Sequence, residues 1–285
     1  MAKVLAVLRD KRHSPRFSRS VYLLPGMFTV ANLFCGYACI VYAMRADYAA
    51  AAGFIGVATV LDLLDGRIAR LAGATSEFGG EFDSLADVVS FGVAPAILVF
   101  AWGLEPLGRL GWAVGFLYVT AAALRLARFN VQPGSTDKRY FLGMPSPASA
   151  GVLASTVFAW PGGLPIPEAP VVALAMVLVP AFMMVSNIRF RSFGALTLKP
   201  RRSSLVLLQF AFLIAAIVVQ PQPVLFIMAY SYLASGLIGL AVRRLRASSS
   251  VGRGSDSGVD LSHEHLVLRR NPLPQSRQPQ TIRSV

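Results

Sequence analysis

The chain has 285 residues, of which 55% are hydrophobic and only 14% are charged, and its mean hydropathy is +0.58. This composition is too apolar for a water-soluble domain of such length, so it excludes a soluble globular protein and indicates a chain that crosses a membrane several times. The net charge of +13 would also fit a nucleic-acid-binding protein, but the distribution of the basic residues along the chain favours a membrane surface.

The first 20 residues are basic and lack an apolar core of the length that a cleavable signal peptide needs. Within them, the stretch "VLAVLRDKR" predicts a short helix lying on the membrane surface. The two cysteines, Cys35 and Cys39, fall in one apolar run and are interpreted as small hydrophobic core residues. The three histidines lie in polar sequence near the termini, which argues against a histidine-centred active site.

Eight apolar segments come after this basic stretch, and a helix needs about 20 apolar residues to cross the hydrocarbon core. Backbone polar groups inside lipid must pair within their own segment, so each span is predicted to be a helix and the fold class to be all-α. The predicted spans cover residues 21–44, 49–70, 82–103, 110–130, 146–161, 166–186, 204–220 and 223–243, of which the fifth is short.

Basic residues are distributed unevenly between the two ends of these spans. If the N-terminus is cytoplasmic, 25 of the 27 Lys and Arg residues lie in or next to cytoplasmic segments, and only Arg45 and Arg109 lie outside. The positive-inside rule therefore predicts a multi-pass protein of the inner (cytoplasmic) membrane with both termini in the cytoplasm. The polar tail, residues 246–285, is rich in Ser, Arg, Pro and Gly and is predicted to be disordered.

One stretch breaks the apolar pattern, because residues 61–92 contain six of the 14 acidic residues. Asp62 and Asp65 are three residues apart near the end of the second span, and Asp83 and Asp87 are four apart at the start of the third. These spacings place each pair on one helix face. Because a short cytoplasmic turn joins the two spans, the four carboxylates are predicted to converge at the cytoplasmic side.

Carboxylates at membrane depth are costly unless they are compensated. Four anions at close range repel one another in a low dielectric, and oxygen ligands suit hard divalent ions such as Mg²⁺ or Mn²⁺. Two such ions can clamp the oxygens of a phosphoryl displacement. Spacing alone leaves another interpretation open, in which these acids form a proton relay or pair helices.

The same residues match the signature D-x2-D-G-x2-A-R-x8-G-x3-D-x3-D without a departure, and they are Asp62, Asp65, Gly66, Ala69, Arg70, Gly79, Asp83 and Asp87. The chain therefore resembles the CDP-alcohol phosphotransferases, integral membrane enzymes of phospholipid synthesis. The resemblance implies a catalytic six-helix core over residues 21–190, with a cytoplasmic loop and two further membrane helices over 191–245. It also implies a homodimer.

The resemblance implies a role for each matching residue. Asp62, Asp65, Asp83 and Asp87 would bind two divalent ions, Mg²⁺ or Mn²⁺, and Asp87 would also act as the general base. The CDP-diacylglycerol contacts would be Thr29, Gly66, Arg70, Ser76 and Gly79. The family often opens its first span with Pro-Asn-x-x-Thr, whereas this chain has Gly26 in place of the asparagine.

Four further stretches resemble one branch of this family, the bacterial phosphatidylserine synthases, and they are "SLADVVSFGVAPA", "ALRLARFNV", "FLGMPSPASA" and "MVSNIRF". The implied reaction transfers the phosphatidyl group of CDP-diacylglycerol to L-serine. Arg125, Arg128 and Asn130 are candidates for binding serine, since arginine matches a carboxylate in shape and charge. The two arginines are equally consistent with anchors at the membrane surface.

Two groups of alternatives remain. Within the family, the acceptor alcohol is serine, glycerol 3-phosphate, an inositol phosphate or choline. Outside it, a proton-coupled transporter would use the four aspartates as a relay, although such proteins place acids near the bilayer midplane and contain broken helices. The acids here cluster near one interface in one hairpin, which favours the enzyme.

Overall fold

The computed structural model of the protein describes residues 19–72, 77–131, 140–191 and 203–251. The predicted surface helix before residue 19, Ser76 and residues 252–285 of the predicted tail lie outside these ranges. The chain divides into two units, Met1–Leu240 and Ala241–Val285, and all the helices lie in the first unit except the end of the last one.

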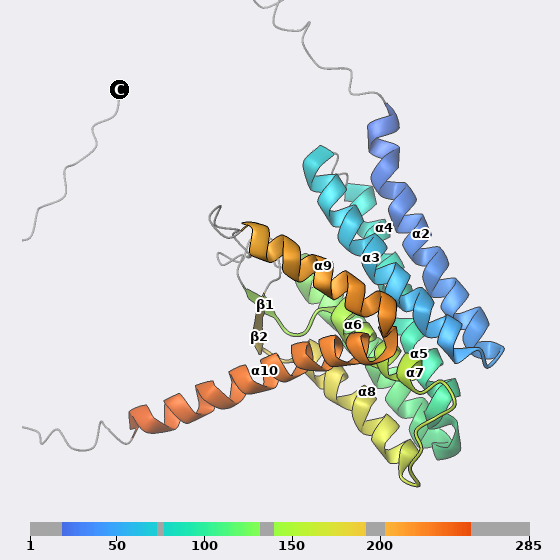
Figure 1. The fold of residues 1–285 in the computed structure, drawn as a ribbon, viewed down its shortest axis with the longest axis vertical. Coiled ribbons are helices and arrows are strands. Elements are labelled where there is room, and N and C mark those ends of the chain that lie inside the picture. The colour runs from blue at the N-terminus through green and yellow to red at the C-terminus, as the bar shows by residue number, and fades with distance from the viewer. Residues whose placement is uncertain (1–18, 73–76, 132–139, 192–202, 252–285) are drawn as a thin grey trace, which may run out of the picture. The chain divides into compact units, whose positions relative to one another are not determined.

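The described part of the chain is almost entirely helical (Figure 1). Its helices are α2 (Arg19–Met44), α3 (Tyr48–Ala72), α4 (Glu77–Asp87), α5 (Ala94–Val99), α6 (Arg109–Val131), α7 (Ser146–Ala159), α8 (Ala169–Val185), α9 (Ser203–Val219) and α10 (Pro221–Val251). One short antiparallel pair, β1 (Tyr140–Leu142) and β2 (Arg189–Arg191), sets Phe141 opposite Phe190. Helix α10 continues through residues 246–251, which were predicted to belong to the tail.

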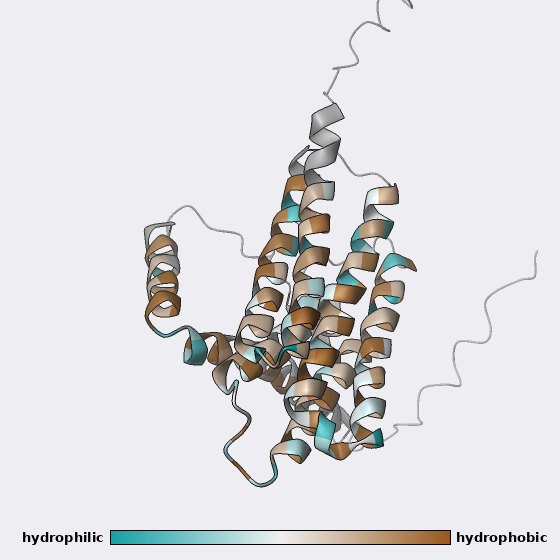
Figure 2. Ribbon diagram, turned by 90° about the vertical axis from the view of Figure 1, so that its right-hand side faces the viewer, coloured by the Kyte–Doolittle hydropathy of each residue, from teal (hydrophilic) through white to brown (hydrophobic). Residues whose placement is uncertain are grey.

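Every predicted span corresponds to an apolar helix, and brown, hydrophobic residues dominate the helices in Figure 2. Among the described residues, five helices are long and apolar enough to cross a membrane: Gly26–Met44, Tyr48–Ile68, Phe78–Leu107, Arg109–Val131 and Pro221–Gly239. Three more are apolar but shorter, at Ser146–Ala159, Ala169–Val185 and Leu207–Val219. The all-α, polytopic membrane fold is confirmed, and the protein is embedded in a membrane.

Helix α7 is shorter than a membrane span because prolines bound it. The helix begins at Ser146, between Pro145 and Pro147, and ends at Ala159, shortly before Pro161. Proline is tolerated in the first turn of a helix but breaks the helix interior. At 1.5 Å per residue its 14 residues rise only about 21 Å. Nine of the 14 are buried, so α7 packs inside the bundle rather than facing lipid along its length.

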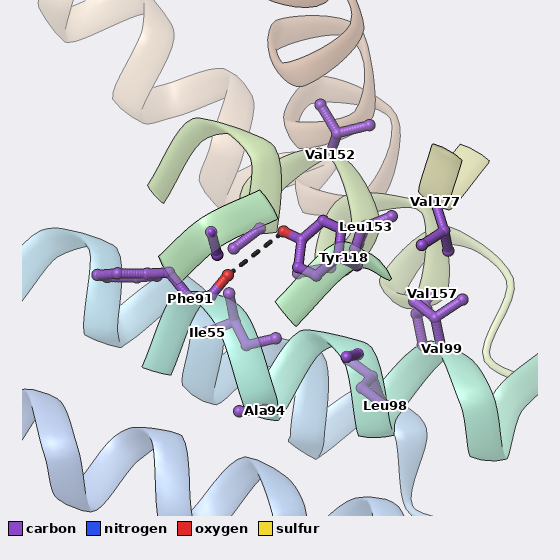
Figure 3. Close-up of a cluster of buried hydrophobic side chains, with 14 of the residues drawn as sticks. Ile55, Phe91, Ala94, Leu98, Val99, Tyr118, Val152, Leu153, Val157 and Val177 are labelled. Carbon is purple, nitrogen blue, oxygen red and sulfur yellow. Dashed lines mark hydrogen bonds between the residues drawn. The ribbon is translucent and has the colours of Figure 1, made fainter. Parts of the chain in front are cut away.

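The third span, Phe78–Leu107, is not a uniform α-helix. Two wider π-helical turns, Val88–Val93 and Phe100–Leu104, flank α5. Pro95 has no N–H and cannot donate to the carbonyl of Phe91 four residues earlier. The hydroxyl of Tyr118 donates to that carbonyl instead, at 3.3 Å, and so binds α6 to the π-helical turn (Figure 3).

The apolar core extends over α2, α3, the third span, α6, α7 and α8, and Tyr118 of α6 lies within it. The same Tyr118 hydroxyl pairs with the hydroxyl of Ser149 on α7 at 3.1 Å, so one buried side chain connects the third span, α6 and α7. Other buried side chains of this core include Phe91, Leu98, Val99, Val152, Leu153 and Val157 (Figure 3). Packing in this core fixes the positions of the helices, and several of these helices carry polar side chains near their ends.

Helix α2 packs along α3 and against the first half of the third span (Figure 1). A close approach occurs at Gly36, where an added Cβ would lie 2.6 Å from Ser90 Oγ and 2.8 Å from Ser90 Cα. The hydroxyl of Ser90 donates to the Asn32 carbonyl at 3.0 Å across the same interface. A glycine is therefore needed at this position to bring the two backbones together.

We expect Gly36→Ala to destabilise the fold by about 1–3 kcal/mol, because the new methyl overlaps the backbone of Ser90. The matched control is Gly56→Ala on α3, where an added Cβ meets nothing within 4 Å and alanine is expected to be neutral or stabilising. Thermal unfolding of both variants in the same detergent compares them. Equal midpoints would contradict the close packing of α2 on Ser90.

Candidate active site

The acidic stretch forms the end of a helical hairpin. Asp62 and Asp65 lie near the end of α3, and Asp83 and Asp87 lie on α4, which begins only five residues after α3 ends. The short connection keeps the two pairs at the same end of the bundle, opposite the tight turn that joins α2 to α3 at residues 45–47. The acids are therefore gathered at one end of the bundle by two helices that follow each other in the chain, and α2 packs against both of them.

Three of the four carboxylates come within metal-binding reach of one another. Asp62, Asp83 and Asp87 each offer one oxygen, and these oxygens all lie within 4.8 Å of one another. All three side chains are half-buried. Like charges at this distance in a partly apolar setting repel strongly, so the arrangement requires a compensating cation or proton.

Asp65 lies beside this group but makes a different contact. It is buried, and its Oδ2 accepts a hydrogen bond of 2.6 Å from the hydroxyl of Thr29 on α2. Asp65 still interacts electrostatically with Asp62 and Asp83. Three predicted metal ligands thus converge, and the fourth is turned toward α2 at the edge of the cluster.

Asn32, on α2, belongs to the site although no sequence motif pointed to it. Its side chain is buried, and its Nδ2 donates to Asp87 Oδ1 at 3.2 Å. Asn32 lies three residues after Thr29, so the two polar side chains share the helix face that meets the aspartates. The signal available in the sequence was an amide side chain three residues after a hydroxyl, within an otherwise apolar run.

Two buried oxygens of the site lack a hydrogen-bond donor among the described residues. They are Oδ1 of Asn32 and Oδ1 of Asp83. An unsatisfied buried polar group costs about 1–3 kcal/mol, more when it is charged. A cation held by these oxygens would satisfy them and offset the repulsion among the carboxylates. A set of carboxylate and amide oxygens is the ligand type that Mg²⁺ and Mn²⁺ prefer, so the residues fit a divalent metal.

Arg125 of α6 borders the acidic cluster. Its Nη1 donates to the hydroxyl of Ser146, at the start of α7, over 2.6 Å. Its electrostatic partners are Asp87, Tyr232 and Asp62. Ser146 and Tyr232 were not identified from the sequence, because they come from α7 and α10, far from Arg125 along the chain.

The other two residues predicted to contact serine, Arg128 and Asn130, form hydrogen bonds with residues other than the aspartates. Arg128 Nη2 donates to Asn187 Oδ1 at 2.7 Å, which joins the end of α6 to the segment after α8. Asn130 Nδ2 donates to Ser84 Oγ at 3.0 Å, which joins α6 to α4. Arg125 is therefore the best placed of the three candidates to meet a group bound at the aspartates.

The residues predicted to contact the nucleotide differ in how far they are buried. Thr29 is buried against Asp65, Gly66 is exposed on α3, and Gly79 is half-buried on α4. Arg70 belongs to the last turn of α3, but its side chain lies outside the described part of the chain, and so does the whole of Ser76. These assignments stay predictions.

The sequence that forms this site and fold is similar to the sequences of known proteins. Residues 22–188 match the CDP-alcohol phosphatidyltransferase family, and the match covers all four aspartates and Arg125. The chain belongs to this family of membrane-embedded transferases. Membership makes the protein a transferase rather than a transporter.

Relatives within the family share one name in two bacteria. The chain is 35% identical over 223 residues to the CDP-diacylglycerol–serine O-phosphatidyltransferase of Helicobacter pylori, a match that covers 76% of this chain and 91% of that protein. It is 34% identical over 272 residues to the Mycobacterium leprae protein of the same name, covering 91% of this chain and 88% of that protein. A third relative, the archaetidylserine synthase of Methanothermobacter thermautotrophicus, is 37% identical over 138 residues, covering 48% of this chain and 58% of that protein.

Proposed function

We propose that this protein is a CDP-diacylglycerol–serine O-phosphatidyltransferase, which transfers the phosphatidyl group of CDP-diacylglycerol to the hydroxyl of L-serine and releases CMP. The observation that carries the proposal is the cluster of Asp62, Asp83 and Asp87, in a chain that matches nearly the whole length of relatives with this name. The substrates are accordingly CDP-diacylglycerol and L-serine.

The metal centre of the proposed enzyme consists of Asp62, Asp65, Asp83 and Asp87, holding two divalent ions, Mg²⁺ or Mn²⁺. The convergence of three carboxylates and the unsatisfied Oδ1 of Asp83 support this assignment. When bound, such ions neutralise the negative charge that develops on the phosphoryl oxygens during transfer. Asp65 would contribute its Oδ1, since its Oδ2 accepts the hydrogen bond from Thr29.

Asp87 is the proposed general base. It accepts the proton of the serine hydroxyl, and the serine oxygen forms a bond with the phosphorus that carries diacylglycerol. The bond from that phosphorus to the bridging oxygen breaks, and CMP leaves with the electron pair. Asp87 suits this role because Asn32 holds one of its oxygens and Arg125 lies beside it, so the carboxylate is already oriented.

The diphosphate and nucleotide of CDP-diacylglycerol are proposed to bind beside the turn between α3 and α4. Thr29, Gly66, Arg70, Ser76 and Gly79 are the proposed contacts. Gly66 and Gly79 carry no side chain, which would let a ligand approach the helix backbone near the aspartates. The acyl chains remain in the bilayer.

Arg125 is proposed to bind the serine carboxylate, while Arg128 and Asn130 lie further along α6, toward its end. The partial burial of Arg125, its contact with Ser146 and its position beside Asp87 support this role. A planar guanidinium can hold a carboxylate through two parallel hydrogen bonds.

Arg125→Lys is expected to raise the KM for serine by about tenfold or more, because an ammonium cannot bind a carboxylate through two parallel hydrogen bonds. The KM for CDP-diacylglycerol should change little. The matched comparison is Arg128→Lys, whose side chain bonds Asn187 instead and whose serine KM should change less. Steady-state kinetics in mixed micelles measures these values. An unchanged serine KM in Arg125→Lys would contradict the assignment.

The proposed enzyme is a homodimer of the inner membrane, with both termini and the active site at the cytoplasmic face. The basic residues near the acid-bearing end of the helices support this orientation. The proposed domain division is a catalytic core over residues 21–190 and two further membrane helices up to residue 245, with a tail after them.

CMP release from CDP-diacylglycerol by the purified protein, with and without serine and Mn²⁺, tests the function. Release is expected only when both are present. An acceptor panel with glycerol 3-phosphate, an inositol phosphate and choline separates the alternatives within the family. Release that depends on one of these rather than on serine would replace serine as the acceptor, and no release with any of them would overturn the function.

A further inference from the structure

We propose that Asn32 is a positioning residue of the active site, which holds the carboxylate of Asp87 and completes the oxygen shell of the metal centre. This inference rests on the proposed function. Asn32 is only 1% exposed, and it lies in an apolar helix that supplies none of the acidic residues of the cluster. Burying a polar amide in such a helix costs free energy unless the amide forms hydrogen bonds.

The first part of the role is the hydrogen bond from Asn32 Nδ2 to Asp87 Oδ1, at 3.2 Å. A donor on one carboxylate oxygen restricts rotation of the whole group and leaves the other oxygen to face the cluster. A hydrogen bond to a charged acceptor is also stronger than one between neutral groups. Groups that hold a ligand or base in this way set its geometry without touching the substrate.

The backbone beneath Asn32 is itself held in place. Ser90 Oγ donates to the Asn32 carbonyl at 3.0 Å, and Ser90 lies about one turn after Asp87 on the same helical span. Gly36, one turn after Asn32, allows the backbones to approach at Ser90. Asn32 and Asp87 are therefore registered to each other by a second hydrogen bond and a close backbone contact, which gives the amide a defined direction.

The second part of the role concerns Oδ1 of Asn32, which is buried without a hydrogen-bond donor among the described residues. Covalent geometry places it about 2.2 Å from Nδ2, so it lies next to the same carboxylate. Oδ1 of Asp83 is unsatisfied within the same described part of the chain. Both are acceptors, so a bound cation or its water would satisfy both, and an amide oxygen is a suitable ligand for a hard divalent ion.

Two substitutions separate this role from simple packing. Asn32→Leu keeps the branched shape but removes donor and acceptor, whereas Asn32→Asp keeps the shape and Oδ1 but replaces the donor with a charge that repels Asp87. Both are expected to lower kcat about 10- to 100-fold, with the KM for CDP-diacylglycerol unchanged. Asn32→Leu should also weaken Mn²⁺ binding by a similar factor, whereas Asn32→Asp keeps an oxygen ligand and adds a negative charge, so its Mn²⁺ affinity should not fall. Mn²⁺ affinity is measured by electron paramagnetic resonance on purified protein without substrate.

Thr156→Val is the matched control. Thr156 is also buried and hydrogen-bonded across helices, to the Tyr230 hydroxyl at 2.9 Å. It lies near the end of α7, one turn before Trp160, whose carbonyl accepts from Trp102 near the far end of the third span from the aspartates. This variant should lose stability while it keeps the kcat and the Mn²⁺ affinity of the wild type.

The outcomes distinguish the inference from the function on which it rests. If wild-type protein neither binds Mn²⁺ nor releases CMP with serine, the proposed function is wrong. If the wild type does both and Asn32→Asp retains the wild-type kcat, or folded Asn32→Leu retains the wild-type Mn²⁺ affinity, the role of Asn32 is wrong. Should Asn32→Leu fail to fold, Asn32→Asp still decides, because it preserves the shape of the side chain.

Discussion

Asp87→Asn is expected to lower kcat by about 100- to 10,000-fold, the usual contribution of a general base. Asparagine has the same shape as aspartate but cannot accept the proton of the serine hydroxyl. It also removes one of the three converging carboxylates and leaves Asp62 and Asp83. The binding of CDP-diacylglycerol should persist, since the other aspartates and the turn between α3 and α4 are unchanged.

Single-turnover CMP release and equilibrium binding of CDP-diacylglycerol measure these two effects separately. The matched control is Glu81→Gln, the same chemical change at an exposed acid nearly two turns earlier on α4. Glu81→Gln should retain wild-type turnover. If Asp87→Asn kept a kcat within about tenfold of the wild type, Asp87 would not be the base.

Asp62→Ala is expected to weaken Mn²⁺ binding by more than about 100-fold and to abolish turnover, since loss of a ligand exceeds the roughly 10- to 100-fold effect of losing an outer-shell partner. The same change should stabilise the metal-free protein or leave it unchanged. Asp62 repels Asp83 and Asp87 at close range, and its removal relieves that repulsion.

Thermal unfolding with increasing Mn²⁺ tests both halves of this expectation. A bound ion stabilises the folded state by RT ln(1 + [ligand]/Kd), so the wild type should gain stability with Mn²⁺ and Asp62→Ala should not. Glu105→Gln, at an exposed acid near the far end of the third span, should behave like the wild type. Turnover by Asp62→Ala in the presence of a chelator would refute the metal centre.

Much of the fold could be predicted from local patterns in the sequence. The apolar segments and their helical conformation were predictable because lipid offers no hydrogen-bond partners, so the backbone groups of each segment must pair with one another. The acid hairpin was predictable because residues three or four apart share a helix face and because only a short turn joins α3 to α4. Asp62, Asp83 and Asp87 converge for these reasons.

Helix lengths were less predictable, since packing decides how far an apolar helix must extend. Three of the eight apolar helices in the described ranges are shorter than the five long ones. Within the third span, the two π-helical turns around Pro95 were not predicted, although a proline removes one donor from the helix. Whether Phe91 would find another donor depended on Tyr118, 27 residues away.

The apolar helices, the family signature and the grouping of the aspartates could all be recognised in the chain before any packing was known, because they depend on spacings within one helix or one hairpin. Three contacts could not: Asp65 turns to Thr29, Asn32 meets Asp87, and Arg125 rather than Arg128 borders the cluster. Asn32 and Asp87 are 55 residues apart, and no local pattern specifies such a contact. It arises because the packing of α2 against the third span, through Gly36 and Ser90, selects which side chains face each other.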